Sequence, residues 1–275
     1  MKFTAPLAVA AAFLVAACAQ DQSAPSSVPA PAQHEPSISI SAAGPVSTAP
    51  RPRRSPASYN EVNTSRPFVA LTFDDGPHPQ LTPQLLDVLR NEGVRATFYV
   101  IGRNVETYPE IARRIVAEGH EIANHSWSHP TLTAISAARL AKEITSTTEV
   151  IQRVTGRRPT NMRPPYGAVN ERVRQSMFKD HGLDVIMWSV DPLDWRRPGA
   201  EVVRQRLVDG AKPGGILLAH DIHPGTIEAM PGTIRDLKAK GFGFATVSQL
   251  LALQDAPAPR STPAVQEQAA VRRSE

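Results

Sequence analysis

Short apolar runs alternate with amphipathic segments between residues 66 and 254. The amphipathic segments, such as 83–93 and 109–119, carry apolar residues at helical spacing and predict helices. The runs between them are rich in β-branched or aromatic residues and predict about seven strands, at 68–73, 96–101, 120–126, 161–163, 184–190, 215–220 and 244–247. Strands that alternate with helices pair in parallel through right-handed crossovers. The sequence therefore predicts an α/β fold, a distorted (β/α) barrel with about seven parallel strands, and an open doubly wound sheet is the alternative.

The segments on either side of this region differ from it in composition. Residues 19–65 and 255–275 are rich in Pro, Ser, Ala and Gln and contain few large apolar side chains. Such segments bury too little surface to offset the entropy lost on ordering. We therefore expect a disordered linker over 19–65, one catalytic domain over 66–254 and a disordered tail over 255–275.

Residues 1–18 are typical of an export signal. Lys2 precedes an apolar stretch that is short for a bilayer span, and small residues lead to Cys18, the only cysteine of the chain. The tetrapeptide VAAC resembles the lipobox at which bacterial lipoproteins are cleaved and acylated on the cysteine, and an ordinary signal peptide is the alternative. We expect an exported cell-envelope protein, held at a bacterial membrane by lipidated Cys18.

The charge of the chain gives no indication of a nucleic-acid partner. The 30 basic and 26 acidic residues leave a formal net charge of +4. The basic residues are scattered or lie in the terminal segments, and they do not gather on one periodic face.

Polar residues follow nearly every predicted strand. The carboxyl ends of the strands of a parallel barrel meet at one face, which is where active sites of such barrels lie. We therefore take these residues as candidates for one site: Asp74, Asp75, His125, His129, Arg163, Asp191, Asp194 and His220.

The segment HSWSH, with the Asp pair before it in the chain, indicates a metal site. His125 and His129 are four residues apart, a spacing that can direct two imidazoles at one centre. Two histidines and one carboxylate form a catalytic type of zinc site that leaves a position for water. Zinc is the metal that this ligand set favours, and other divalent ions also fit it.

Five motifs in this region resemble those of one enzyme family. TFDDGP, HSWSH, RPPYG, DPLDW and LLAH occur in the order and approximate spacing of the NodB-type polysaccharide deacetylases, carbohydrate esterase family 4. Members of that family are metal-dependent hydrolases with a distorted barrel fold, and they deacetylate N-acetylglucosamine polymers such as peptidoglycan and chitin or, less often, xylan. The resemblance implies a polysaccharide N-deacetylase. An O-acetyl esterase of the xylan type and a catalytically silent glycan-binding lipoprotein are the alternatives.

The resemblance also implies how the adjacent carboxylates divide their work. Asp75 would bind the metal together with His125 and His129. Asp74 would be the general base that takes a proton from the attacking water, and Arg163 would pair with Asp74 and orient it.

Two further motifs imply the groups that handle the products. His220 would be the general acid that protonates the departing amine, and the backbone N–H of Tyr166 would stabilise the oxyanion. Leu217 or Leu218 would line the pocket for the acetyl methyl group.

The motif DPLDW leaves one assignment open. The resemblance implies Asp194 as a partner of the active-site Arg or His and Trp195 as a wall of the acetyl pocket. Asp191 is the alternative to Asp194, since spacing does not separate them. His223 is close to His220 in the sequence, and we assign it no role.

Overall fold

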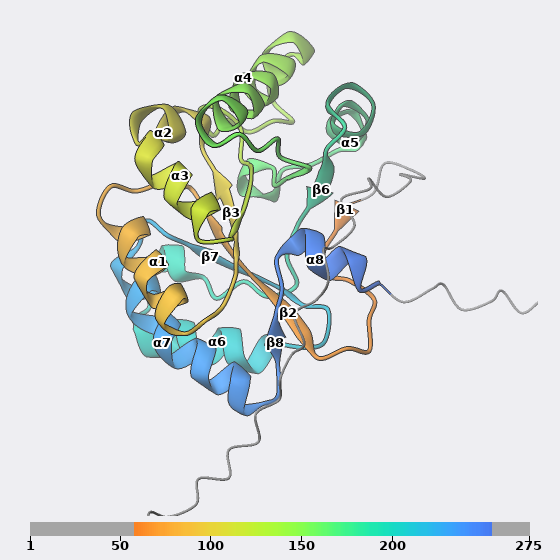
Figure 1. The fold of residues 1–275 in the computed structure, drawn as a ribbon. Helices are drawn as coiled ribbons and strands as arrows, with labels where there is room; N and C mark the ends of the chain where they lie inside the picture. The colour runs from red at the N-terminus through yellow and green to blue at the C-terminus, as the bar shows by residue number, and fades with distance from the viewer. Residues whose placement is uncertain (1–57, 255–275) are drawn as a thin grey trace, which may run out of the picture. The chain divides into compact units, whose positions relative to one another are not determined.

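The computed structural model describes residues 58–254 (Figure 1). The export signal, Cys18, most of the expected linker and the expected tail lie outside the described residues. Within residues 58–254, no helix is both long and apolar enough to cross a membrane.

The described chain contains one sheet surrounded by helices (Figure 1). The strands are β1 (Ser58–Tyr59), β2 (Phe68–Asp74), β3 (Thr97–Val100), β4 (Glu121–Asn124), β5 (Asn161–Met162), β6 (Asp184–Ile186), β7 (Ile216–His220) and β8 (Gly243–Phe244). The helices are α1 (Leu81–Asn91), α2 (Gly102–Thr107), α3 (Pro109–Ala117), α4 (Ala137–Thr155), α5 (Glu171–Ser176), α6 (Ala200–Gly210), α7 (Pro224–Ala239) and α8 (Val247–Ala252). Three short helical turns are η1 (Pro165–Gly167), η2 (Met177–His181) and η3 (Asp194–Arg196).

The strand order confirms the predicted barrel. The strands pair in parallel in the order β1-β6-β5-β4-β3-β2-β7, and β8 pairs with β2. Isolated bridges join the two ends of this order, Glu61 to Gly215 and Val190 to Leu217. The sheet therefore closes on itself where an open doubly wound sheet would leave two free edges. The closure between β7 and the end formed by β1 and β6 consists of isolated bridges, which makes the barrel distorted.

The alternation of β2 directs its side chains to two different cores. Val69, Leu71 and Phe73 pack in the large outer cluster beneath the helices. Ala70 packs in the smaller inner cluster with Tyr99 and Ile216. Successive side chains of a strand point to opposite faces, so Asp74 faces the barrel interior like Ala70.

The first residues of the domain were predicted as linker, and this part of the prediction is wrong. β1 pairs with β6, and Val62 is buried and donates its N–H to the carbonyl of Gly214 at 2.8 Å. Gly214 has a φ of 77°, and a Cβ there would lie 1.8 Å from the Val62 oxygen. The domain therefore begins by residue 58, because a polar stretch that composition assigns to the linker completes the edge of the sheet.

Candidate active site

A cavity of about 450 Å³ lies where the loops that follow the strands converge. Its lining residues are Asp74, Asp75, His125, His129, Pro164, Tyr166, Gly167, Trp188, Asp191, Trp195, Leu218, His220 and His223. Two further predicted residues, Arg163 and Asp194, are buried and contact lining residues directly. The structure therefore brings all the predicted site residues together.

The adjacent carboxylates diverge because the backbone changes conformation between them. Asp74 ends β2 with its side chain toward the barrel interior, and Asp75 has a φ of 78°. The side-chain amide of Asn104 holds the Asp75 carbonyl at 2.9 Å. Because Asp75 adopts this left-handed conformation, its carboxylate points in a direction that an extended strand conformation would not allow.

Asp75, His125 and His129 form the one group of three metal-ligating side chains found within residues 58–254. Their ligand atoms lie within 4.8 Å of one another. Asp75 Oδ1 lies 3.2 Å from His129 Nε2 and 3.4 Å from His125 Nε2. The atom is buried, and no donor in the described chain hydrogen-bonds to it.

The tautomer of His125 supports a cation at this point. Its Nδ1 lies 2.7 Å from the carbonyl of Arg163, which can only accept a hydrogen bond, so Nδ1 carries the proton. In the neutral imidazole, Nε2 of His125 then presents a lone pair toward Asp75. A carboxylate oxygen without a donor and converging imidazole nitrogens fit a divalent cation, which would satisfy all of them.

The three side chains of this group differ in how their surroundings shift the pKa. Burial alone would lower the pKa of His125, but the charges of Asp74 and Asp75 raise it. Burial alone would raise the pKa of Asp75, but the proximity and charge of His125 and His129 lower it to about 2. Burial and the charge of His125 lower the pKa of His129, which favours its neutral form.

A buried glutamate fixes the loop between the two histidines. Glu143 of α4 accepts hydrogen bonds from the backbone N–H of Trp127 at 2.9 Å and of Ser128 at 2.8 Å. Its other oxygen accepts the Ser128 hydroxyl at 2.7 Å. A side chain that looks like part of a solvated helical face in the sequence therefore positions both predicted ligands.

Arg163 is fully buried and holds one oxygen of Asp74. Its Nη1 donates to Asp74 Oδ1 at 2.7 Å and to Thr72 Oγ1 at 2.8 Å, and its Nη2 donates to the carbonyl of Met187 at 2.8 Å. The guanidinium also lies 4.2 Å from the ring centre of Tyr99. With Oδ1 engaged, Oδ2 of Asp74 is the oxygen that faces His125, at 3.8 Å from Nε2.

Asp194 contacts His220, and Asp191 does not occupy that position. Asp194 Oδ1 lies 2.8 Å from His220 Nδ1, and Oδ2 accepts the backbone N–H of His220 at 2.8 Å and the hydroxyl of Thr226 at 2.7 Å. Asp191 instead accepts the backbone N–H of Leu193 at 2.8 Å. The geometry thus separates the two carboxylates that spacing left open.

The Asp194 contact changes the protonation of His220. Burial alone would lower the pKa of His220, but the hydrogen bond and charge of Asp194 raise it to about 9. His220 is therefore protonated at neutral pH, and its Nε2 is the nitrogen left for the cavity.

The other predicted lining residues differ in exposure. Leu218 is buried at the cavity wall, whereas Leu217 is part of the outer core and does not line it. Tyr166 and Trp195 are 71% and 48% exposed, so both rings lie at the mouth. The Tyr166 ring contacts the edge of His129, with 4.6 Å between ring centres.

Backbone strain is concentrated in the loops of this site. Among residues 58–254, the non-glycine residues with positive φ are Asp75, Ser126, His129, Tyr166, Leu193 and Arg197. All six lie in the loops after β2, β4, β5 and β6. Such conformations cost on the order of 1–3 kcal/mol each and persist where the surroundings enforce them, commonly at functional sites.

Asp221 is a buried carboxyl beside the site that the sequence did not reveal. Its Oδ2 accepts the Thr82 hydroxyl at 2.5 Å, and a Cβ on Gly76 would lie 2.2 Å from the same oxygen. Burial raises the pKa of Asp221 to about 7. Asp221 therefore packs against the turn that follows Asp75, where only glycine fits.

Trp188 and His223 also line the cavity without having been predicted to do so. Trp188 closes over Gly167, where a Cβ would lie 2.9 Å from the indole. The His223 ring centre lies 5.9 Å from that of His220. Both lie close in the sequence to predicted site residues, Trp188 before Asp191 and His223 after His220, and this proximity is the signal that could have identified them.

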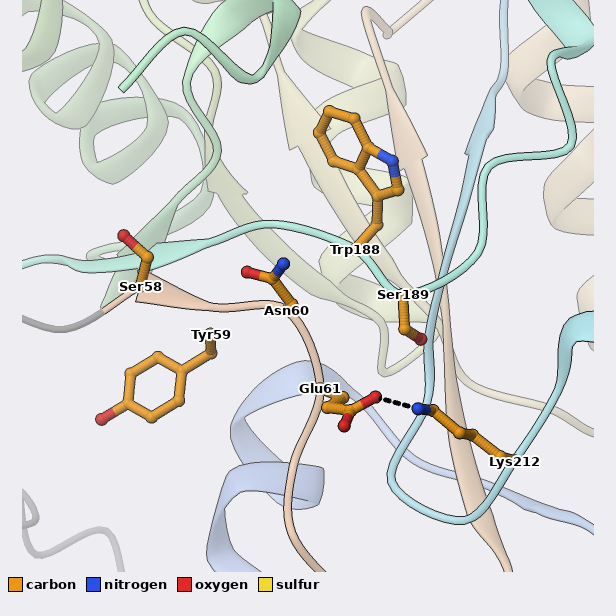
Figure 2. A pocket seen from close by; sticks show the side chains of 7 residues that line it. All are labelled: Ser58, Tyr59, Asn60, Glu61, Trp188, Ser189 and Lys212. Carbon is orange, nitrogen blue, oxygen red and sulfur yellow. Dashed lines mark ion pairs between the residues drawn. The ribbon is translucent and has the colours of Figure 1, made fainter. Parts of the chain in front are cut away.

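A second hollow of about 480 Å³ lies beside β1 and is a weaker candidate (Figure 2). Its main interaction is the ion pair between Lys212 and Glu61 at 2.5 Å, both about half exposed. Trp188 lines both hollows, and Figure 2 shows its indole directed away from that ion pair. This hollow lacks the converging ligands of the first.

Comparisons with known proteins indicate the family of the chain. The polysaccharide deacetylase family model matches residues 61–186. The peptidoglycan-N-acetylmuramic acid deacetylase PdaC of Bacillus subtilis is 41% identical over 189 residues, which are 69% of this chain and 40% of that protein. The chain thus spans well under half the length of this relative.

Two other proteins match over most of their length. The chitooligosaccharide deacetylase of Bradyrhizobium sp. is 38% identical over 208 residues, which cover 70% of this chain and 94% of that protein. The solved structure of a carbohydrate esterase family 4 pseudoenzyme of Bacillus anthracis superposes with a TM-score of 0.70 at 30% identity, covering 74% of this chain and 72% of that one. On this similarity, the chain belongs to the polysaccharide deacetylase family.

Proposed function

We propose that this chain is a metal-dependent hydrolase that removes acetyl groups from N-acetylglucosamine-containing polysaccharide of the cell envelope. One observation carries the proposal. The cavity contains both a triad that could bind a divalent cation, Asp75, His125 and His129, and a separate, protonated His220. Hydrolysis of an amide needs both an activated water and a proton for the departing amine.

Asp75, His125 and His129 would hold the metal, and we infer zinc from the donor set of one carboxylate and two imidazoles. A divalent cation bound there supplies a Lewis acid for the acetyl carbonyl and for the attacking water.

Asp74 would be the general base. Its Oδ1 is engaged by Arg163, so Oδ2 is the atom that takes the proton of the attacking water. Arg163 orients the carboxylate through further bonds to Thr72 and Met187, which hold the guanidinium in place.

His220 would be the general acid. Asp194 holds its Nδ1, so Nε2 donates the proton to the amine nitrogen as the C–N bond breaks. The backbone N–H of Tyr166 would stabilise the oxyanion, and Trp195 and Leu218 would wall the acetyl methyl group.

The polymer is proposed from the names of the relatives. The B. subtilis relative is named for peptidoglycan and the Bradyrhizobium relative for chitooligosaccharides. An export signal ending in lipidated Cys18 would place this chain at a bacterial membrane beside peptidoglycan, so we propose peptidoglycan as the first substrate to test.

Two other functions are compatible with the same cavity. An O-acetyl esterase would use the same water and base on a better leaving group and depend less on His220. A silent glycan-binding protein is favoured by one observation, the similarity to a pseudoenzyme.

The deciding experiment measures acetate released by the purified protein after metal removal and after zinc is resupplied. Peptidoglycan, N-acetylglucosamine oligomers and acetylxylan are assayed in parallel. Zinc-restored release from an N-acetylated polymer supports the proposal. Release from acetylxylan alone would make the protein an esterase, and folded, zinc-loaded protein that releases no acetate would be the silent binder.

A further inference from the structure

Two arginines follow Trp195 at the mouth of the cavity. Trp195 lines the cavity, and Arg196 and Arg197 are exposed beside it. The Arg196 guanidinium lies 4.7 Å from the centre of the Trp195 ring. The charge of Arg197 helps to lower the pKa of His223, a cavity residue, after the larger effect of burial. Both positive charges therefore lie at the rim of the site.

Neither guanidinium is engaged by an acidic side chain of the described chain. Two other arginines that contact the site loops are occupied: Arg163 by Asp74, and Arg206 by the carbonyl of Pro192. Arg196 and Arg197 have no ion pair with any described residue, in contrast to the partly buried Arg204, which pairs with Glu201. Their charge is available to a ligand.

The backbone that carries these arginines is held rigidly. Leu193 and Arg197 both have a φ of 55° and bracket η3. The N–H of Arg196 bonds to the Leu193 carbonyl at 3.0 Å, and the N–H of Arg197 bonds to the Asp194 carbonyl at 2.8 Å. A fixed turn reduces the entropy lost when the two side chains engage a ligand.

The charges inside the cavity differ from those at its rim. Asp74 and Asp75 line its floor, and Asp191 lines its wall with one oxygen bonded to Leu193. A divalent cation held by Asp75 and the protonated His220 would offset these carboxylates. No described acidic side chain pairs with the two rim arginines, so the rim keeps a positive charge that attracts an anion. The charges thus suit a glycan whose acetamido group enters the cavity while a neighbouring substituent carries a negative charge.

We propose that Arg196 and Arg197 form a carboxylate subsite that favours muramyl glycans over neutral N-acetylglucosamine oligomers. This inference rests on the proposed function, since it assumes that a glycan occupies the cavity. Guanidinium groups bind carboxylates through paired N–H donors, and indole rings pack against sugar faces, so Trp195 and Arg196 can contact a sugar and its acidic substituent together. The carboxylate comes from the lactyl group of muramic acid or from the peptide attached to it.

The test compares Arg196→Gln/Arg197→Gln with the wild-type full chain. Titration calorimetry measures Kd for peptide-free muramyl oligomers, for the same oligomers with the lactyl carboxyl converted to an amide, for peptide-bearing muropeptides and for neutral N-acetylglucosamine oligomers. Acetate release is measured on the same four ligands. The matched control is Arg157→Gln/Arg158→Gln, an exposed pair in the loop before β5 that removes the same charge away from the cavity.

We expect the wild type to bind carboxylate-bearing oligomers more tightly than the amidated or neutral ones. In Arg196→Gln/Arg197→Gln this preference should fall about three- to tenfold, the size expected for two solvent-exposed charge-assisted contacts. The control should keep the wild-type preference. If the preference is lost only for the peptide-free oligomers, the arginines bind the lactyl carboxylate. If it is lost only for the muropeptides, they bind a carboxylate of the peptide. Either result supports the subsite.

Three results would overturn the subsite. They are an unchanged preference in the rim variant, an equal loss in the control variant, and an equal loss of binding to amidated and acidic oligomers. Acetate release separates this inference from the proposed function. A carboxylate preference that depends on the arginines, without acetate release, would keep the subsite and reject the hydrolase, whereas acetate release without such a preference would do the reverse.

Discussion

The cavity contains two histidine–carboxylate clusters that are built from the same residue types and have opposite chemistry. In the triad, Asp75 faces the Nε2 atoms of His125 and His129 at 3.4 and 3.2 Å without a hydrogen bond. In the second cluster, Asp194 lies 2.8 Å from Nδ1 of His220. Each imidazole has two ring nitrogens, and the carboxylate faces one of them. Which nitrogen it faces, together with the hydrogen-bond partner of the second nitrogen, decides whether the imidazole offers a lone pair or a proton.

The surroundings reinforce this difference. The Arg163 carbonyl accepts the hydrogen bond from Nδ1 of His125, on the side away from Asp75. In the neutral imidazole, Nε2 of His125 therefore directs a lone pair toward the centre of the triad. Around Asp194, the N–H groups of Trp195 and His220 and the Thr226 hydroxyl all donate, which keeps that carboxylate anionic and its histidine charged. Substitutions that each remove one side chain from these clusters or from their support should therefore affect metal binding and the pKa of His220 separately.

The largest effect should come from removing a triad ligand. His125→Ala leaves Asp75 and His129 as the remaining predicted ligands, so bound metal should be lost. Acetate release should fall on the order of a thousandfold or more, because a catalytic metal supplies several kcal/mol of transition-state stabilisation. Metal content by mass spectrometry and acetate release are measured together. His181→Ala, a half-buried histidine of η2 outside the cavity, is the control, and activity retained without metal would reject the triad.

The next effect should come from Asp194→Asn, which removes the charge that keeps His220 protonated. The folded-state pKa of His220, about 9, is raised above 6.5, so the acid form is present at neutral pH and is lost as pH rises through the raised value. Without Asp194 the pKa should fall by about one to three units. The basic limb of the kcat/KM profile should then move to lower pH, and NMR titration of His220 reports the shift directly.

Asp191→Asn is the matched control for that shift. Asp191 lies in the same loop and carries the same charge, but it bonds to Leu193 and not to His220. A basic limb that moves equally in both variants would show that general electrostatics of the loop, and not the Asp194 contact, raise the pKa of His220.

A smaller effect should come from Glu143→Gln, which weakens the support of the triad without touching a ligand. Glutamine can keep the acceptor for the N–H groups of Trp127 and Ser128, but it removes the negative charge that strengthens those bonds and forces the Ser128 hydroxyl to accept where it donated. Metal affinity should fall about tenfold, at the low end for groups that position metal ligands. Competition with a chelator measures the affinity, and exposed Glu149→Gln on the same helix should leave it unchanged. An unchanged affinity would show that the loop positions its histidines without Glu143.

The sequence predicted the barrel and the residues that line the cavity better than it predicted the residues that hold them in place. Most predicted strands are local apolar runs, and the candidate site residues end or follow the predicted strands, so short segments carry both signals. β1 was missed because a two-residue strand in a polar stretch has no periodicity, and only its pairing with β6 makes it a strand.

The supporting residues were missed because their partners are remote in the sequence. Glu143 and Thr226 each bond a site loop from a helix, and neither differs in sequence from a solvated helical residue. Asp191 and Asp194 could not be separated by spacing, since the left-handed Leu193 between them decides which carboxylate turns toward His220.

The smallest effect should come from Thr226→Val, which removes one donor from Asp194 and preserves side-chain shape. Asp194 keeps its bonds to Trp195 and His220, so its pKa should rise and that of His220 should fall only slightly. We expect a loss of about 1 kcal/mol in the free energy of unfolding, measured by urea denaturation, with a few-fold loss of kcat/KM above neutral pH. Thr233→Val, whose hydroxyl bonds to the Ala229 carbonyl within α7, should cost similar stability without moving the pKa of His220. If both variants left that pKa unchanged, Asp194 would hold His220 without help from α7, and the contrast between the clusters would rest on the carboxylate alone.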